Sequence, residues 1–177
     1  MKKILITAAL TVQFLLIGFS QNPQKKAPNT VNTSLTKKVV ILMDKVVKSD
    51  GEWKRQLSAE SYHVTRNAGT ETAYTGMYWD NHEKGLYSCI CCGQPLFLSN
   101  TKFDSETGWP SFFQTIDKRC VIENKDTAYG MVRVEIVCSR CNAHLGHVFE
   151  DGPVPTHLRY CMNSVALKFE KGNFTVK

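Results

Sequence analysis

The sequence has no cysteine before Cys89, no long Lys/Arg run, and no apolar run long enough to cross a bilayer. Lys and Arg occur as isolated doublets, and the formal net charge is +6. A charge of that size without a basic run excludes a dedicated nucleic-acid surface, so we expect no nucleic-acid partner. The apolar stretch from Ile4 to Phe19 is sixteen residues long. It falls short of the ~20 residues that a membrane-spanning helix requires.

The first twenty residues instead match the pattern of a secretory signal peptide. Lys2 and Lys3 precede the apolar stretch, and Gly18 and Ser20 are small residues at the positions that a signal peptidase reads. The absence of an early cysteine excludes a lipid-modified N-terminal cysteine after cleavage. We therefore expect residues 1–20 to be a signal peptide and the protein to be exported, either periplasmic or secreted. Their removal takes away two lysines and no acids, which lowers the formal charge from +6 to +4.

Residues 21–48 read as a linker or N-terminal extension, because their first half is polar and holds two prolines. The remaining residues, 49–177, have the length of one ordinary domain. Ser49 and Glu52 have the spacing of a capping box and predict a short helix. Ser58 predicts the start of a second helix that runs through Tyr62.

After Gly69 the sequence predicts small antiparallel β structure, because short runs of Tyr, Phe, Val and Ile alternate with turn residues. We predict strands over Tyr129–Val137, Ser164–Phe169 and Phe174–Lys177. The β-branched cluster within 35–47 is compatible with either strand or helix. The expected fold is mainly β, with small antiparallel sheets, short N-terminal helices and a zinc site that staples the sheets together.

The zinc prediction comes from two Cys-x-x-Cys pairs that lie 45 residues apart. Each pair can form a tight turn with both sulfur atoms facing one ion, and the following residues, Gly93 and Asn142, tolerate such a turn. Disulfides are the alternative, since an exported chain permits them, but two pairs of identical spacing favour a metal. Cys91 is a spare cysteine in this interpretation. The predicted ligands of a structural zinc ion are Cys89, Cys92, Cys138 and Cys141.

A separate cysteine, Cys161, is the candidate nucleophile. A thiol at its ordinary pKa is mostly protonated at neutral pH, and nearby histidine or arginine cations promote the thiolate. His144, His147 and Arg159 are the candidates for that role. A lone cysteine is more often a small buried hydrophobic residue. The combination of residue types nevertheless favours a reactive site.

Five motifs occur in one order and together resemble a known family. They lie at Tyr87–Phe97, Gly108–Phe112, Cys138–Cys141, His144–Phe149 and Arg159–Ser164. Over about Trp53 to Phe169 the chain resembles the methionine-R-sulfoxide reductases, the MsrB family. The resemblance implies two small antiparallel sheets with a structural zinc remote from the catalytic thiol. It also implies reduction of the R epimer of methionine sulfoxide, mainly within oxidised proteins or peptides, and hence protein repair.

The resemblance assigns Cys161 the attack on the sulfoxide sulfur, which would leave a sulfenic acid on Cys161 and release methionine. His144 and His147 would position and protonate the sulfoxide oxygen, because loss of that oxygen requires proton delivery.

Further roles follow from the same resemblance. Asn163 would form a hydrogen bond in the pocket, and Trp109 would provide an apolar wall for the substrate methyl group, unless it is plain core packing. Arg159 and Asp151 would orient the histidines and tune the thiol.

The chain departs from the family pattern at Thr107, where many members have a resolving cysteine. The sulfenic acid would then be reduced by an external thioredoxin-like or other thiol reductant, or resolved by Cys120 or, less favoured, Cys91. We expect a monomer.

Two other classes of protein remain open from the residues alone. A zinc-dependent binding module would use only the two cysteine pairs, and Cys161→Ser would leave its function intact. A zinc hydrolase is disfavoured because four cysteines fill the coordination sphere.

Overall fold

The computed structural model of the chain describes residues 35–176. The predicted signal peptide and the extension up to residue 34 lie outside the described residues, as does Lys177. Within the described part, no helix combines the length and the apolar character that a bilayer crossing requires.

Two short helices begin where their capping residues predict. Helix α1 (Asp50–Gln56) has the complete capping box, in which the Ser49 backbone N–H donates to Glu52 Oε2 at 2.8 Å. Helix α2 (Ala59–Asn67) begins after Ser58, whose hydroxyl accepts from Ser61 N at 3.0 Å, and it continues five residues past Tyr62. Two further one-turn 3-10 helices, η1 (Ser99–Thr101) and η2 (Lys118–Cys120), lie between strands.

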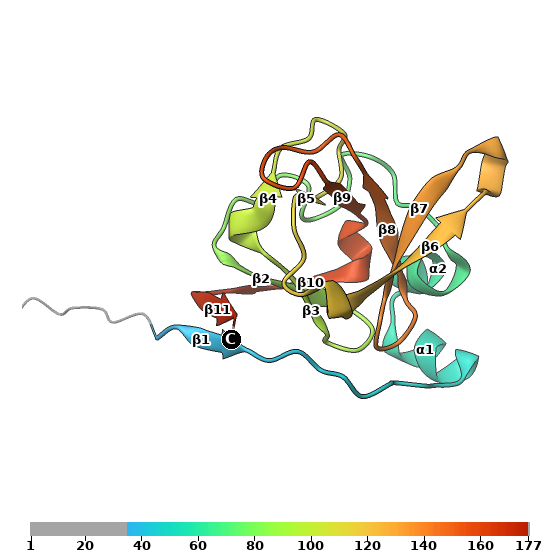
Figure 1. The fold of residues 1–177 in the computed structure, drawn as a ribbon. Helices are drawn as coiled ribbons and strands as arrows, with labels where there is room; N and C mark the ends of the chain where they lie inside the picture. The colour runs from blue at the N-terminus through green and yellow to red at the C-terminus, as the bar shows by residue number, and fades with distance from the viewer. Residues whose placement is uncertain (1–34, 177) are drawn as a thin grey trace, which may run out of the picture. The chain divides into compact units, whose positions relative to one another are not determined.

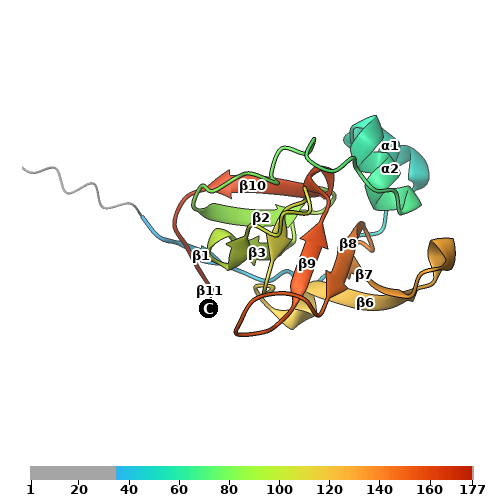
Figure 2. The same cartoon turned by 90° about the horizontal axis from the view of Figure 1, so that it is seen from above.

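Most of the domain is built from two antiparallel sheets (Figures 1 and 2). The three-stranded sheet has the order β10 (Leu167–Lys171), β2 (Gly85–Cys89), β3 (Pro95–Leu98). The six-stranded sheet has the order β4 (Lys102–Phe103), β5 (Ser111–Phe112), β9 (Arg159–Met162), β8 (His144–Phe149), β7 (Arg133–Cys138), β6 (Val121–Asp126). The antiparallel β prediction is therefore confirmed, with one addition. Strand β1 (Lys37–Val39) pairs in parallel with β11 (Phe174–Val176).

Two of the predicted strands begin later than expected. The run predicted from Tyr129 starts as a 3-10 turn, η3 (Ala128–Gly130), and strand β7 begins only at Arg133. The run predicted from Ser164 likewise starts as η4 (Ser164–Ala166) before β10. At both places the chain changes direction before it joins a sheet, and alternation of residue types alone does not reveal such a turn.

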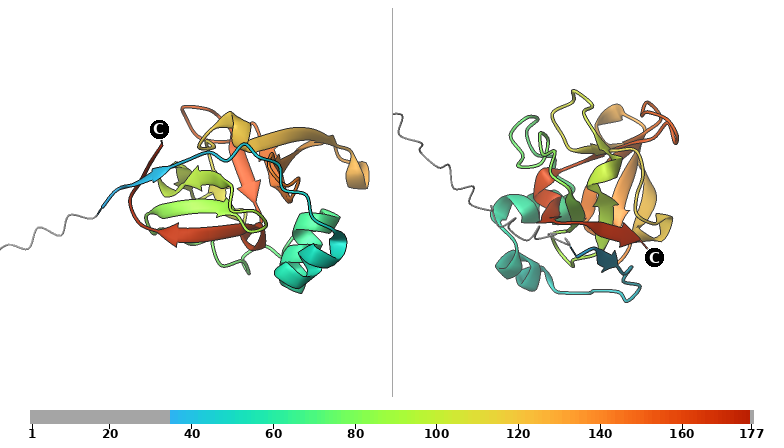
Figure 3. Two further views of the ribbon diagram at one scale, coloured as in Figure 1. Left: turned by 90° about the horizontal axis from the view of Figure 1, so that it is seen from below. Right: turned by 90° about the vertical axis from the view of Figure 1, so that its left-hand side faces the viewer.

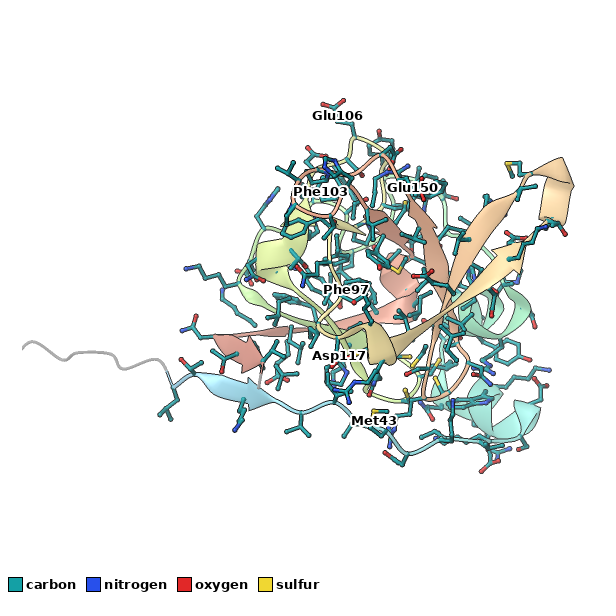
Figure 4. The ribbon with its side chains drawn as sticks, viewed as in Figure 1. Met43, Phe97, Phe103, Glu106, Asp117 and Glu150 are labelled. Atoms are coloured by element: carbon teal, nitrogen blue, oxygen red, sulfur yellow. The ribbon has the colours of Figure 1, made fainter. Side chains whose placement is uncertain are left out.

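Aromatic side chains from both sheets form the core between them. Phe97 on β3 stacks on Phe112 on β5 with ring centroids 4.3 Å apart. Tyr87 on β2 meets the same Phe112 ring edge-on at 5.0 Å. Figure 4 shows Phe97 in the interior, whereas Met43 and Glu106 lie at opposite edges of the view. All three rings are fully buried, so this contact holds the two sheets together.

Residues 35–48, part of the predicted extension, lie along the domain as an extended segment (Figure 3). Only β1 has regular structure there, so most of the β-branched cluster within 35–47 is in neither a strand nor a helix. Leu42 N donates to Gln94 Oε1 at 3.1 Å, and Val46 N donates to the Arg140 carbonyl at 2.8 Å. These contacts attach the segment to a residue just after one Cys-x-x-Cys turn and to a residue within the other.

Candidate active site

One cross-strand row of the six-stranded sheet carries the candidate nucleophile. Ser111 on β5 lies opposite Cys161 on β9, Cys161 lies opposite His147 on β8, and His147 lies opposite Glu135 on β7. Directly opposed residues in antiparallel strands share a face of the sheet, so these side chains gather on one side.

A bulge brings His144 to the same face as His147. Residues three apart in a regular strand point to opposite faces. In β8 the register shifts so that Gly146 opposes Ile136 while His144 opposes Val137, which leaves one extra residue. The two imidazole rings consequently lie 5.4 Å apart between centroids. Gly146 has φ of 156° and no room for a Cβ, which would lie 2.1 Å from the Cys161 carbonyl oxygen.

Each histidine ring is held by its own carboxylate. His144 Nδ1 donates to Glu135 Oε1 at 2.7 Å, and His147 Nε2 donates to Asp126 Oδ2 at 2.8 Å. Asp126 also accepts from the Ala128 backbone and the Arg133 guanidinium, and together with His147 these groups lower the Asp126 pKa to about 2. The carboxylate beside His147 is therefore ionised at neutral pH.

The two histidines differ in burial. Burial lowers the pKa of His144, although the nearby Glu135 carboxylate opposes that shift. Nε2 of His144 is buried and has no hydrogen-bond partner in the part of the chain that the structure describes. His144 thus presents a neutral, unpaired nitrogen, whereas His147 lies beside the cysteine.

The candidate nucleophile opens onto a small cavity of about 110 Å³. Its lining combines apolar side chains with a few polar ones. The lining residues are Thr70, Trp109, Arg133, Gly146, His147, Phe149, Cys161, Met162 and Asn163. A larger groove of about 800 Å³ adjoins it and shares Thr70, Arg133 and His147. Four predicted catalytic residues thus lie at the small cavity, and His144 lines the adjoining groove.

Arg159 lies close to the thiol but has a different partner from the one we expected. Its guanidinium forms a two-pronged ion pair with Asp151 at 2.8 and 2.7 Å and lies 4.3 Å over the Phe149 ring. The histidine rings are oriented by Glu135 and Asp126, so the expectation that Arg159 and Asp151 orient them is wrong. Burial raises the Cys161 pKa, while Thr107, Arg159 and Ser111 act in the opposite direction.

Glu71 is a buried carboxylate that sequence reasoning missed. Its oxygens accept from the backbone of Ser164 at 2.6 Å and of Val165 at 3.0 Å. Its backbone N–H donates to Asn163 Oδ1 at 3.0 Å, and its carbonyl accepts from Trp109 Nε1 at 3.1 Å. One residue therefore fixes the two side chains predicted to line the substrate pocket. The Trp109 indole is only partly buried, so it is not plain core packing.

Comparison with known proteins identifies the family of this chain. The SelR domain matches residues 57–171. "Peptide methionine sulfoxide reductase MsrB" of Herminiimonas arsenicoxydans is 54% identical over 129 residues, which is 73% of this chain and 94% of that protein. The MsrB of Hahella chejuensis is 55% identical over 135 residues, or 76% of this chain and 97% of that protein. The chain belongs to the MsrB family.

The two Cys-x-x-Cys pairs of this MsrB chain form one sulfur cluster at the other end of the sheets. One pair lies between β2 and β3 and the other between β7 and β8, so the cluster joins the two sheets. Gly93 and Asn142 close the turns with φ of 74° and 56°, as their residue types predict. The four sulfur atoms lie within 4.8 Å of one another.

These distances fit a tetrahedral zinc ion better than disulfides. Cys89 Sγ is 3.7 Å from Cys141 Sγ, and Cys92 Sγ is 3.5 Å from Cys138 Sγ. Zn–S bonds of about 2.3 Å give sulfur–sulfur edges of about 3.8 Å in a tetrahedron. A disulfide requires about 2.05 Å. The four thiols thus have the number, type and spacing of a closed structural zinc site.

The fold of this chain places neither Cys120 nor Cys91 beside Cys161. Cys120 precedes β6, which lies three strands from β9, or roughly 14 Å at ~4.8 Å per strand. A disulfide needs Cα atoms within about 7 Å. Burial also raises the Cys120 pKa to about 11. Cys91 is buried and contacts Cys89 and Cys141 instead.

Proposed function

We propose that Cys161 is the nucleophile of a thiol-dependent reductase acting on the R epimer of methionine sulfoxide, mainly in oxidised proteins. MsrB family membership supports the activity. The observation that carries the residue assignment is the small cavity bounded by Cys161, His147, Trp109 and Asn163. Its volume of about 110 Å³ suits a single side chain, and the adjoining groove offers room for the rest of a peptide.

In this mechanism the Cys161 thiolate attacks the sulfoxide sulfur. The oxygen leaves the methionine sulfur and ends as the hydroxyl of a sulfenic acid on Cys161, so one sulfur is reduced and the other oxidised. An external thiol then displaces that hydroxyl as water and forms a mixed disulfide. A second external thiol releases Cys161 and leaves as the oxidised disulfide.

His147 is the proton donor to the departing oxygen in this proposal, since it faces Cys161 across the β8–β9 ladder. The ionised Asp126 stabilises the imidazolium form of His147 that proton donation requires. His144 has the free nitrogen described above and accepts a hydrogen bond from the substrate oxygen once that oxygen is protonated, or from an intervening water. Trp109 packs against the substrate methyl group, and Asn163 forms a hydrogen bond in the pocket.

Zinc, held by Cys89, Cys92, Cys138 and Cys141, supplies structural cross-linking and no chemistry at Cys161 in this proposal. Its role is to join the β2–β3 and β7–β8 turns, which the backbone geometry of both turns supports. Gly93 N donates to the Cys89 carbonyl at 2.8 Å, and Asn142 N donates to the Cys138 carbonyl at 2.9 Å.

We also propose export, a monomeric state and an external thiol reductant. Export is supported by the predicted signal peptide at residues 1–20. The external reductant is supported by Thr107, which cannot resolve a sulfenic acid, and by the burial of Cys120 and Cys91. A thioredoxin-like protein is the expected donor, and no nucleic-acid partner is expected.

The deciding experiment is an assay of the purified protein with dithiothreitol on separated R and S epimers of a peptide-like methionine sulfoxide. Turnover of the R epimer alone is expected. Cys161→Ser should lose more than about a thousandfold of that activity, because the nucleophile is removed. Cys120→Ser, which removes a buried thiol away from the cavity, is the control and should retain turnover. Equal rates on both epimers, or an active Cys161→Ser variant, would contradict the proposal.

A further inference from the structure

Three hydroxyl side chains form a chain that ends at the Cys161 sulfur. Thr107 Oγ1 lies 3.8 Å from Cys161 Sγ. Ser105 Oγ lies 2.8 Å from Thr107 Oγ1 and 2.7 Å from Ser111 Oγ. Ser111 is fully buried and lies opposite Cys161 in the β5–β9 ladder, so the far end of the chain is anchored in the sheet.

When Cys161 is a thiol, the number of available protons fixes which of these hydroxyl groups donates to which. Ser111 donates to the Trp109 carbonyl oxygen at 3.2 Å. A hydroxyl has a single proton, so Ser105 must donate to Ser111 and Thr107 must donate to Ser105. Thr107 Oγ1 then faces the sulfur with a lone pair and accepts a hydrogen bond from the S–H group.

The same chain can donate in the opposite direction once the thiol has lost its proton to solvent. Thr107 then donates to the thiolate, Ser105 donates to Thr107, and Ser111 donates to Ser105. The reversal gives up only the bond from Ser111 to the Trp109 carbonyl, the longest of those between oxygen atoms. It gains a charge-assisted bond to the thiolate, which is roughly twice as strong as a neutral one.

We propose that Thr107 is a catalytic residue that stabilises the Cys161 thiolate, and that the Ser105–Thr107–Ser111 chain reverses its direction of donation when Cys161 ionises. The inference rests on the proposed role of Cys161 as the nucleophile. It gives the residue at the position of the family's usual resolving cysteine a function of its own. The hydroxyl chain also acts where burial of Cys161 disfavours the thiolate.

Of the charged groups around Cys161, Arg159 also favours the thiolate, and the hydroxyl groups add to its effect. Arg159 on the same strand is already paired with Asp151, and His147 on β8 is paired with Asp126. His144 on that face is bonded to Glu135, and Arg133, which lines the small cavity, is paired with Asp126. The carboxylate next to Thr107 in sequence, Glu106, is exposed and points outward (Figure 4). Hydroxyl groups do not titrate in the relevant range, so their removal should displace the ionisation of Cys161 without adding a new inflection.

The test is the pH dependence of Cys161 alkylation by iodoacetamide in the full-length protein. Trypsin releases residues 160–168 as a peptide whose only cysteine is Cys161, so mass spectrometry can follow this thiol alone. Thr107→Val should lower the alkylation rate at neutral pH roughly three- to tenfold and move the inflection to higher pH. Thr107→Ser keeps the hydroxyl and should stay near the wild-type profile.

Two further variants separate the effect of the hydroxyl chain on Cys161 alkylation from a general effect of substitution. Ser105→Ala removes the donor that polarises Thr107, so it should move the inflection in the same direction by a smaller amount. Thr101→Val is the matched control, because the Thr101 hydroxyl donates to the Leu98 carbonyl and is not part of the chain. Alkylation of Thr107→Val that matches the Thr101→Val variant would overturn the proposal. Since alkylation requires no turnover, a protein without reductase activity can still pass or fail this test.

Discussion

The protein holds its cysteines in two settings that differ in what surrounds the sulfur. At the Cys-x-x-Cys turns, each sulfur has another sulfur 3.5 or 3.7 Å away and is enclosed by backbone turns. At Cys161 the nearest polar neighbours are hydroxyl groups, an arginine and a histidine, and one side opens to a cavity. The first setting leaves no open position for a substrate. The second provides both a polar environment for a thiolate and access to it.

The two settings are joined by the β7–β8 hairpin. Strand β7 ends at Cys138, and β8 begins at His144, three residues after Cys141. The same hairpin carries Glu135, His144 and His147 toward Cys161. A metal at the turn would therefore fix the ends of β7 and β8. These strands carry Glu135, His144 and His147, which with Cys161 form the face of the sheet that we call the catalytic face. The sulfur cluster and Cys161 are thus connected through the backbone of the β7–β8 hairpin.

The largest expected effect comes from breaking the sulfur cluster. Cys138→Ser should abolish zinc binding and lower the free energy of unfolding by more than about 3 kcal/mol, because the metal links the two sheets. Zinc content by elemental analysis and denaturant unfolding check this outcome. Cys120→Ala removes another fully buried sulfur nearby and should keep the metal, at a cost of about 1 kcal/mol. Full zinc content in Cys138→Ser would show that the cluster is not the metal site.

A smaller effect is expected when the catalytic face is changed and the sulfur cluster is left intact. Asp126→Asn should lower kcat/KM roughly 10- to 100-fold, because a neutral amide stabilises the protonated form of His147 less well. Asp117→Asn is the control, since Asp117 is likewise ion-paired, with Arg119, but lies away from Cys161. Unchanged kinetics in Asp126→Asn would remove Asp126 from the mechanism.

Substitution of Glu71 tests whether a residue outside both sheets positions Trp109 and Asn163 at the cavity. Glu71→Gln replaces an acceptor of two backbone N–H groups with an amide that accepts only one of them. We expect KM to rise three- to tenfold with a smaller change in kcat, since Trp109 and Asn163 shape the pocket and do not transfer protons. Steady-state kinetics on the R epimer measure both constants.

The matched control for Glu71 is Ser61→Ala. The Ser61 hydroxyl donates to the Val165 carbonyl at 2.8 Å, so its loss disturbs the same turn without touching Trp109 or Asn163. A rise in KM of equal size in both variants would mean that Glu71 acts only on stability.

The sequence predicted the sulfur cluster well because short local spacings encode it. Cys-x-x-Cys followed by a turn residue specifies each half of the sulfur cluster, and the capping box specifies the start of α1. Pairing of the two halves across 45 residues followed from the preference of zinc for four ligands.

The partners of the two histidines with proposed catalytic roles could not be predicted in the same way. Asp126, Glu135 and Glu71 reach the site through strand register and loop packing, which depend on contacts distant in sequence. The bulge in β8 that turns His144 toward His147 leaves no local signal except Gly146. Asp151, which the family resemblance led us to expect as a partner that orients the histidines, pairs with Arg159 instead.

The smallest expected effect is on stability in acid. Folding lowers the pKa of Asp126 to about 2, below the ~3.9 of an unfolded aspartate. The ionised Asp126 carboxylate therefore contributes to the free energy of unfolding above about pH 4. This contribution is lost as the pH falls through about 2. Asp126→Asn should therefore flatten the decline in unfolding free energy between pH 5 and 2, as measured by urea titration.

Asp117, whose pKa is also lowered to about 2, lies beyond the far end of β6 and should contribute independently. The two substitutions should consequently add in the double variant, because residues separated by roughly 20 Å of strand share no partners. An Asp126→Asn variant with the wild-type acid profile would mean that this carboxylate gains nothing on folding, and that its pairing with His147 is too weak to organise the catalytic face.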